Sequence, residues 1–459
     1  MKLRSGRQAV AGRDDEPMPL LEPFRLQYIR TEVLPGLASS KPEQERWDVA
    51  RELVEDLGNA ACSSRDGDPA YVSALLERGG FKLITDLLLP SAPLRLREQG
   101  CGIIKYAIAM DDPENDGEDD GAEKSPSDPA PPPSSRSSSQ PPPSRCTAQE
   151  RVVRQVAHLV VDSGTVVAHI VALLGCAGES VKAGAWAVAA LRNMLLSERV
   201  LIKSGRGGGG VREAVIGAAA IPALLGYLEL LLAGEKGLRH SQAPLSLEER
   251  LEMDYGDEDA AASLARAHRE IETMCNVVLS AEGRIDAIWM VAELAYAGAA
   301  EQVLEAGAAA LLLELLLDGL SPSREEQERV GVIFSGASDD HLEESVPVLG
   351  ALQALREEGG DHVFFQALVR CGGVRRLQEV MEAKRWGTEH CVLSERIGNM
   401  TPASKAQLLE AWTQLSSDAH HHLQQQCIDL ALAFVKWSTC NEAGLNPPHQ
   451  NAGAKRGRS

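Results

Sequence analysis

Histidine and cysteine, the side chains that most readily bind zinc, gather in the C-terminal third of the sequence. Three successive histidines, His420 to His422, precede Cys427, and His390 stands next to Cys391. Zinc sites use regularly spaced ligand pairs or an H-E-x-x-H helix, and this set has neither. We therefore predict no metal site and expect these residues to belong to a polar helix face.

Other chemistry-bearing patterns are equally incomplete. The glycine-rich Ser204 to Gly210 lacks the Gly-Lys-Ser/Thr ending and the preceding strand of a phosphate loop, so it predicts a linker. No G-x-S-x-G motif occurs, and no Cys/His or paired-carboxylate constellation stands out from the glutamate-rich background. The sequence predicts no catalytic residues, no cofactor and no enzymatic activity.

The charge of the chain restricts its partners. The formal net charge is −20, of which −7 comes from the stretch between Asp111 and Lys124. An acidic body repels a phosphate backbone, so we expect no nucleic acid as partner. The nine cysteines are odd in number and form no C-x-x-C pair, which favours mostly buried thiols and a cytoplasmic or nuclear location.

One apolar stretch is nearly long enough to cross a bilayer. Val215 to Ala233 is almost entirely apolar, but Glu229 would lie in hydrocarbon at a cost of about 2.5–3.5 kcal/mol. Pro222 would also interrupt the helical hydrogen bonds near its start. We predict no membrane span here and expect a helix buried between neighbouring units.

Composition and hydrophobic periodicity predict an all-helical chain. Aromatic residues make up only 4% of the sequence, and apolar residues recur at helical spacing, as in Val181, Ala185 and Val188. The predicted organisation is a disordered tail over 1–20, helical repeats over 21–110, an acidic and Pro/Ser-rich disordered insertion over 111–147, further repeats over 148–440 with a loop insertion near 234–259, and a disordered tail over 441–459.

A recurring cassette is the strongest signal in the sequence. It consists of a short apolar helix, a glycine joint, a leucine-rich helix, a polar turn and a longer amphipathic helix. Residues 71–110 contain it whole, with Gly79 and Gly80 at the joint and Pro90 after the second helix. The same joint is predicted at Gly217, at Gly307, and at Gly372 with Gly373. Such recurrence indicates a solenoid of stacked repeats.

These segments resemble the armadillo-repeat family. Gly307 with Ala308 and its leucine run, the segment from Ala219 to Leu224, and the segment from Ala190 to Met194 are similar to the second-helix and third-helix patterns of that family. The resemblance covers roughly residues 45–437 and implies an all-α, armadillo-like right-handed solenoid with disordered insertions. Two-helix, HEAT-like units are the alternative.

The resemblance also implies a binding groove lined by third helices. There an asparagine hydrogen-bonds to the backbone of an extended peptide, and a tryptophan one turn earlier forms one side of the site. The alternative is that the tryptophans are core residues between repeats and the asparagines are ordinary polar groups. The positions here that match the partner-binding pattern are Asn59, Trp186, Asn193, Asn276, Trp289 and Glu293.

Three functions follow as hypotheses. The first is a non-enzymatic scaffold or adaptor that binds a segment of another protein along the concave face of the solenoid. The second is an Hsp70 co-chaperone that promotes nucleotide exchange, because some armadillo proteins do so. The third is a regulatory subunit of a larger complex, with the serine-rich insertion over 111–147 open to phosphorylation.

Overall fold

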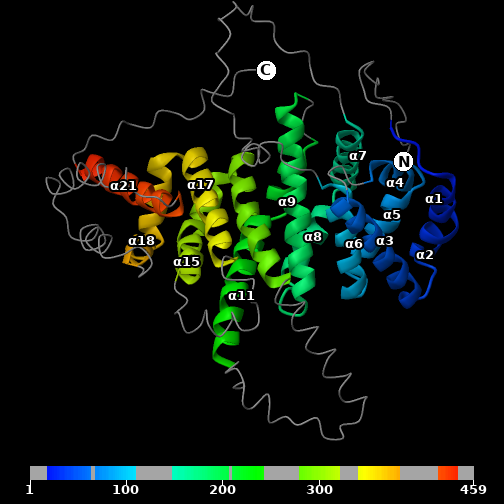
Figure 1. The fold of residues 1–459 in the computed structure, drawn as a ribbon, viewed down its shortest axis with the longest axis horizontal. Coiled ribbons are helices and arrows are strands. Elements are labelled where there is room, and N and C mark those ends of the chain that lie inside the picture. Colours follow the sequence, from blue (N-terminus) through cyan, green and yellow to red (C-terminus); the bar gives the residue numbers. More distant parts are fainter. Residues whose placement is uncertain are drawn as a thin grey trace, which may run out of the picture. The chain divides into compact units, whose positions relative to one another are not determined.

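The computed structural model of the chain describes residues 18–63, 68–109, 147–205, 209–241, 279–320, 340–382 and 422–442. Within these ranges all regular structure is helical, as predicted (Figure 1). The chain divides into two compact units, unit 1 from Met1 to Ala223 and unit 2 from Leu224 to Ser459.

Unit 1 begins with an N-terminal group of helices and continues with two complete three-helix repeats. The N-terminal group is α1 (Pro23–Tyr28), the π-helical turn η1 (Ile29–Val33), α2 (Leu34–Leu37) and α3 (Glu43–Ser63). The first repeat contains α4 (Pro69–Glu77), α5 (Gly80–Leu88) and α6 (Leu94–Ala107). The second contains α7 (Ala148–Ser163), α8 (Val166–Leu174) and α9 (Val181–Lys203), and α10 (Val211–Gly217) opens a third.

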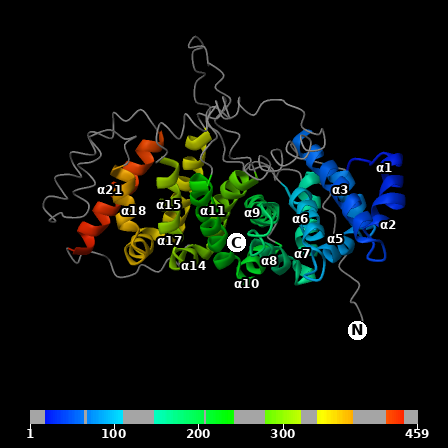
Figure 2. The same cartoon turned by 90° about the horizontal axis from the view of Figure 1, so that it is seen from below.

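Equivalent helices of successive repeats pack side by side in unit 1. The third helices α3, α6 and α9 form one row, the first helices α4, α7 and α10 a second, and α5 lies against α8 (Figures 1 and 2). Apolar faces meet along these rows, with Leu53, Ile103 and Leu191 among the residues buried to within 2% exposure. Each complete repeat of unit 1 contains three helices, as expected for an armadillo-like solenoid.

Unit 2 follows the same helix order. After α11 (Ala220–Ser241) come a helix over residues 279–294, the π-helical turn η3 (Ala295–Ala299), α14 (Ala300–Glu305) and α15 (Ala308–Leu320). The long α17 (Asp340–Arg370) changes direction at Gly360, so its first part is a third helix and its second part opens the next repeat. That repeat is completed by α18 (Gly373–Glu382) and α21 (His422–Glu442). Here α15 lies against α18, and α17 against α21.

The joints between first and second helices carry a residue in the left-handed conformation. This residue is Gly79, Gly164, Gly307 or Gly372, with φ between 65° and 94°. Between α7 and α8 it turns the chain by 88°. A left-handed residue ends one helix and lets the next begin at a steep angle, and glycine adopts this conformation without a steric penalty. The predicted joints at Gly79, Gly307 and Gly372 are confirmed.

The predicted joint at Gly217 is wrong by two residues. Gly217 is the last residue of α10, and the left-handed residue is Ala219, with φ 58°. The amides of Ala218 and Ala219 still donate to the carbonyls of Ala214 and Ile216, so the last turn of α10 continues past Gly217 and the chain reverses only at Ala219. An alanine therefore occupies a conformation that costs a non-glycine residue roughly 1–2 kcal/mol.

Several predicted boundaries shift by a few residues. α11 is helical as far as Ser241, beyond Gly234 where the loop insertion was expected to begin, and α21 ends at Glu442 rather than before the predicted tail at 441. Residues 242–259 and 110–146 lie outside the described residues. Among the described residues, no single helix is both long and apolar enough to span a membrane. The stretch from Val215 to Ala233 is divided between α10 and α11.

Candidate protein-binding surface

Trp186 lies across the seam between the third helices α6 and α9. A Cβ atom added at Gly102 of α6 would stand 2.5 Å from Cζ3 and 2.7 Å from Cε3 of the indole, and 3.2 Å from Cγ2 of Val54 on α3. The ring therefore rests directly on the backbone of α6, and any other residue at position 102 would displace it. Trp186 is only half-buried, so one part of the ring packs between helices and another is open to solvent.

Lys182 covers this ring, and charged side chains from two other helices act on Lys182. The ammonium nitrogen of Lys182 lies 4.0 Å from the centre of the Trp186 ring, in the geometry of a cation–π contact. Burial lowers the pKa of Lys182, and Arg51 lowers it further, while the carboxylates of Glu98 and Glu55 act in the opposite direction. Side chains of the third helices α3, α6 and α9 thus interact with one another.

Hydrogen bonds fix the acidic members of this group. The Ser180 hydroxyl caps α9 by accepting from the Ala183 amide and donates to Oε1 of Glu98 at 2.5 Å. Arg51 and Glu55 form an ion pair of 3.1 Å along α3. We call the group Glu55, Asn59, Glu98, Lys182 and Trp186 the third-helix face of unit 1.

The predicted asparagines of unit 1 have different environments. Asn59 is exposed on α3, whereas Asn193 of α9 is half-buried and donates from Nδ2 to the backbone carbonyl of Lys105 at 3.1 Å. That carbonyl belongs to the last turn of α6, where helix carbonyls lack intrahelical partners. Asn193 therefore ties α9 to the end of α6, and its other polar atom, Oδ1, remains an acceptor. Asn276 lies outside the described residues.

The remaining predicted positions, Trp289 and Glu293, lie in unit 2 on the helix over residues 279–294. Trp289 is half-buried, and its Cη2 and Cζ3 atoms would be 3.6 Å from a Cβ at Gly350 of α17. Glu293 is only 5% exposed, so it is part of the interior of the unit. The structure thus keeps Trp289 as a partly open ring over a neighbouring helix, and it buries the carboxylate expected beside it.

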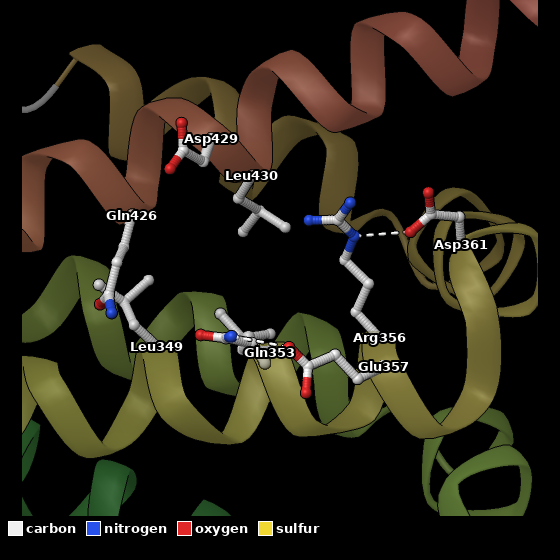
Figure 3. A pocket seen from close by; sticks show the side chains of 9 residues that line it. Leu349, Gln353, Arg356, Glu357, Asp361, Gln426, Asp429 and Leu430 are labelled. Atoms are coloured by element: carbon white, nitrogen blue, oxygen red, sulfur yellow. Dashed lines mark hydrogen bonds and ion pairs between the residues drawn. The ribbon is translucent and has the colours of Figure 1, made fainter. Parts of the chain in front are cut away.

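A cavity of about 290 Å³ lies in unit 2 between the third helices α17 and α21. Figure 3 shows side chains from both helices directed into the space between them. Within the lining, Nε of Arg356 donates to Oδ1 of Asp361 at 2.6 Å, and Nε2 of Gln353 donates to Oε1 of Glu357 at 2.7 Å. The full lining is Leu349, Leu352, Gln353, Arg356, Glu357, Asp361, Gln426, Asp429 and Leu430.

Sequence reasoning missed Lys182, Gly102 and this cavity. The spacing of Lys182 and Trp186, one helical turn apart, was a usable signal, because residues four apart share a helix face. The sequence around Gly102 did not indicate its role, because a glycine inside a helix is required only where another side chain packs against it, as Trp186 does here. The cavity depends on two helices that are far apart in the chain.

The cysteines differ in their exposure. Of the described cysteines with placed side chains, Cys101 is buried, whereas Cys371 is exposed and Cys176 and Cys440 are intermediate, so the prediction of mostly buried thiols is wrong for these. Burial raises the pKa of Cys101 to about 12, which keeps its thiol protonated and unreactive. The side chains of the His390 and His420–His422 set lie outside the described residues, within which no cluster suited to a metal ion occurs.

Comparison with known proteins adds only distant similarities. No family model matches the sequence, and no curated protein matches it. A designed armadillo repeat protein, YIII(Dq)4CqI, is similar in structure at 14% identity and a TM-score of 0.41, with 89% of this chain and 99% of that chain covered. Two engineered proteins match at 13% identity with a TM-score of 0.40 and at 12% with 0.19; each match covers 90% of this chain and 98% of the other.

The helix order and packing define the class of protein. Three-helix units with left-handed joints, stacked so that equivalent helices form rows, make this chain an armadillo-like, all-α repeat protein. Stacked repeats bury one continuous seam and leave long rows of side chains on their surface, a property that suits protein binding.

Proposed function

We propose that this chain is a non-enzymatic scaffold or adaptor that binds an extended segment of a partner protein along the third-helix face of unit 1. The observation that carries the proposal is the half-exposed ring of Trp186, which is held on Gly102 and covered by Lys182, whose ammonium group interacts with Glu98 and Glu55. A flat aromatic wall next to groups of both charges can hold the stem of a partner side chain and select its polar end.

Two asparagines on the third helices of unit 1 add amide groups to this surface. Asn59 is an exposed amide on α3, and the Oδ1 atom of Asn193 on α9 offers an acceptor beside the bond to Lys105. Amides suit an extended peptide, because each peptide unit presents one donor and one acceptor. The odd total of nine cysteines, with no C-x-x-C pair, supports a cytoplasmic or nuclear location as part of the same proposal.

The test compares binding by surface variants that leave the helix seam intact. Glu55→Lys and Asn59→Ala change exposed side chains of α3, and Glu77→Lys makes the same charge reversal on the exposed surface of the first helix α4. Proteins retained from cell extract by the full chain and by each variant are quantified by mass spectrometry. We expect a shared set of partners to be lost with Glu55→Lys and Asn59→Ala but retained with Glu77→Lys. Equal retention by all three would refute the proposed face.

A further inference from the structure

The first helix of the chain, α1, has no residue in the core of unit 1. None of its residues is buried, and its phenylalanine, Phe24, is 69% exposed. The chain enters the core only after α1, where Ile29 and Val33 of the π-helical turn η1 are at most 1% exposed. α1 lies against the first helix α4 (Figure 1). A helix with so few buried contacts can leave the unit while η1 stays in place.

The guanidinium group of Arg25 connects α1 to α4. Its carbon Cζ stands 4.9 Å from the centre of the Tyr71 ring, in the geometry of a cation–π contact, and Nη1 donates to Oδ2 of Asp68 at 2.5 Å. The other oxygen of Asp68, Oδ1, accepts from the Tyr71 amide at 2.9 Å and caps α4. The guanidinium therefore lies on an aromatic face and bonds to a carboxylate that is already fixed by its own helix.

The tyrosine under this guanidinium is almost completely enclosed. Tyr71 is only 1% exposed, yet its hydroxyl has no hydrogen-bond partner among the described residues. Burial raises the pKa of Tyr71, and the carboxylate of Asp56 raises it further, whereas the charge of Arg25 acts in the opposite direction. Arg25 also opposes the rise in the pKa of Asp56, for which burial is the main cause. Departure of Arg25 would therefore open a site with two carboxylates beside an aromatic face.

The ion pair of Arg25 can be exchanged for an equivalent one. The side chain of Arg25 is 34% exposed and that of Asp68 is 17% exposed. Ion pairs that keep contact with water contribute little to stability, because solvent screens both charges. Arg25 is kept near the site mainly because it belongs to the same chain, and an arginine of another molecule can compete for the same groups.

We propose that Asp56, Asp68 and Tyr71 form an arginine-binding site, which Arg25 occupies in the free protein and an arginine of a partner's segment takes over when α1 leaves. A lysine fits less well, because only the planar guanidinium both stacks on a ring and donates in a fixed direction to a carboxylate. The site lies outside the third-helix face of unit 1. It rests on the proposed scaffold function only in assigning the arginine to a partner, and α1 then acts as an internal competitor that weakens partner binding.

The probes are N-acetyl-arginine methylamide and N-acetyl-citrulline methylamide, whose side chains have nearly the same shape but differ in charge. They are titrated into the full chain with ¹³C-labelled tyrosine rings, and the signals of Tyr71, assigned by their loss in Tyr71→Phe, are followed by NMR. In Arg25→Gln, which vacates the site, we expect a saturable shift with the arginine probe in the millimolar range. An equal shift with citrulline, or none with arginine, would overturn the proposal.

Comparison with the unchanged chain tests the competition by α1. A tethered group acts at an effective concentration in the millimolar range, so the unchanged chain should need about ten-fold more arginine probe than Arg25→Gln for half-saturation. Arg25→Lys keeps a cation on α1 and should respond between the two, which repeats the test in a chain that retains this charge. Equal half-saturation in all three chains would exclude Arg25 as the occupant.

A further variant tests the carboxylate of Asp68 without removing the helix cap, because asparagine caps helices about as well as aspartate. Arg25→Gln/Asp68→Asn should bind the arginine probe about ten-fold more weakly than Arg25→Gln. The control is Arg375→Gln in unit 2, which removes an arginine from an exposed ion pair of 3.0 Å with Glu379. A gain in probe binding as large for Arg375→Gln as for Arg25→Gln would show an effect of net charge alone and overturn the assignment.

A second copy of this chain also carries an arginine that fits the site. If sedimentation of Arg25→Gln mixed with the unchanged chain showed a mixed dimer, the occupant would be α1 of the second copy, and a partner's arginine would be excluded. Monomers in the mixture support the partner. Because the Tyr71 signals report on the site at α4, failure of the third-helix face of unit 1 to bind a partner would not alter them.

Discussion

Unit 1 and unit 2 both place a tryptophan over a glycine of a neighbouring third helix, but they do so at different distances. Trp186 would lie 2.5 Å from a Cβ at Gly102, whereas Trp289 would lie 3.6 Å from a Cβ at Gly350. The first distance is shorter than real Cβ contacts allow, and the second is an ordinary van der Waals separation. Glycine is therefore a steric requirement in the unit 1 seam and only a tolerated residue in the unit 2 seam.

The largest expected effect tests this difference directly. Gly102→Ala should destabilise the protein by about 2–3 kcal/mol, because the α6 backbone and the indole cannot both keep their positions. Gly350→Ala should instead stabilise it by about 0.5–1 kcal/mol, since alanine favours the helix and meets no clash. Chemical denaturation of both variants checks the pair. Equal effects of the two substitutions would show that the seams do not differ.

The second effect concerns the hydrogen bonds that hold the helices of unit 1 together. Ser197 on α9 is 1% exposed and donates to the carbonyl of Ile108, just after α6, at 2.7 Å. Ser197→Ala should cost about 1–2 kcal/mol, because it leaves that buried carbonyl unpaired. The control is Thr439→Ala in α21, whose hydroxyl donates within its own helix to Val435 at 2.8 Å. A loss as large for Thr439→Ala as for Ser197→Ala would remove the special role of the interhelical bond.

The third effect compares two joints. Ala219 in unit 1 has φ 58° and Gly307 in unit 2 has φ 94°, so both adopt the left-handed conformation. Ala219→Gly should stabilise the protein by up to about 1 kcal/mol, because glycine relieves the strain at some cost in chain entropy. Gly307→Ala should destabilise it by about the same amount or more. Thermal unfolding of the two variants should shift in opposite directions, and a shift in the same direction would contradict this account of the joints.

The smallest effect distinguishes the units by pH. Burial, and then the nearby charge of Glu52, raise the pKa of Asp56 in unit 1, although Arg25 opposes them. The folded state then holds a proton at pH values where the unfolded state has released it. The free energy of unfolding therefore falls as the pH rises from the ordinary pKa of an aspartate through the raised pKa of Asp56. Asp56→Asn should therefore raise the unfolding temperature at pH 7, and the gain should vanish below the ordinary value of 3.8.

The pKa of Glu379 in unit 2 is shifted in the opposite direction from that of Asp56. Its hydrogen bond with Arg376, 2.8 Å long, lowers the pKa of the Glu379 carboxyl. This contact stabilises the fold above the ordinary pKa of a glutamate and is lost as pH falls through the lowered value. Glu379→Gln should slightly lower the unfolding temperature at pH 7, with no difference from the unchanged chain in strong acid. Parallel pH profiles of Asp56→Asn and Glu379→Gln would contradict the two assignments.

The sequence by itself determined the helices, their order and most of their joints. Local pattern is sufficient for these, because periodic apolar residues select one face of a helix and a glycine marks the place where a first helix must end. Gly79, Gly307 and Gly372 were found in this way. Gly217 was misplaced because glycine is common, and the strained position at Ala219 carries no glycine at all.

Only the tertiary structure decided what the side chains on the third helices do. Whether Trp186 and Asn193 serve packing, binding or both depends on Gly102 and Lys105, residues that are far from them in the chain. The same holds for the cavity, where α17 and α21 meet across a long intervening segment. A sequence indicates which residues share one side of a helix. The distance to the next helix depends on how well the two helix surfaces fit together. That distance decides whether the interface between two helices is tightly packed, as at Gly102, or leaves a cavity, as between α17 and α21.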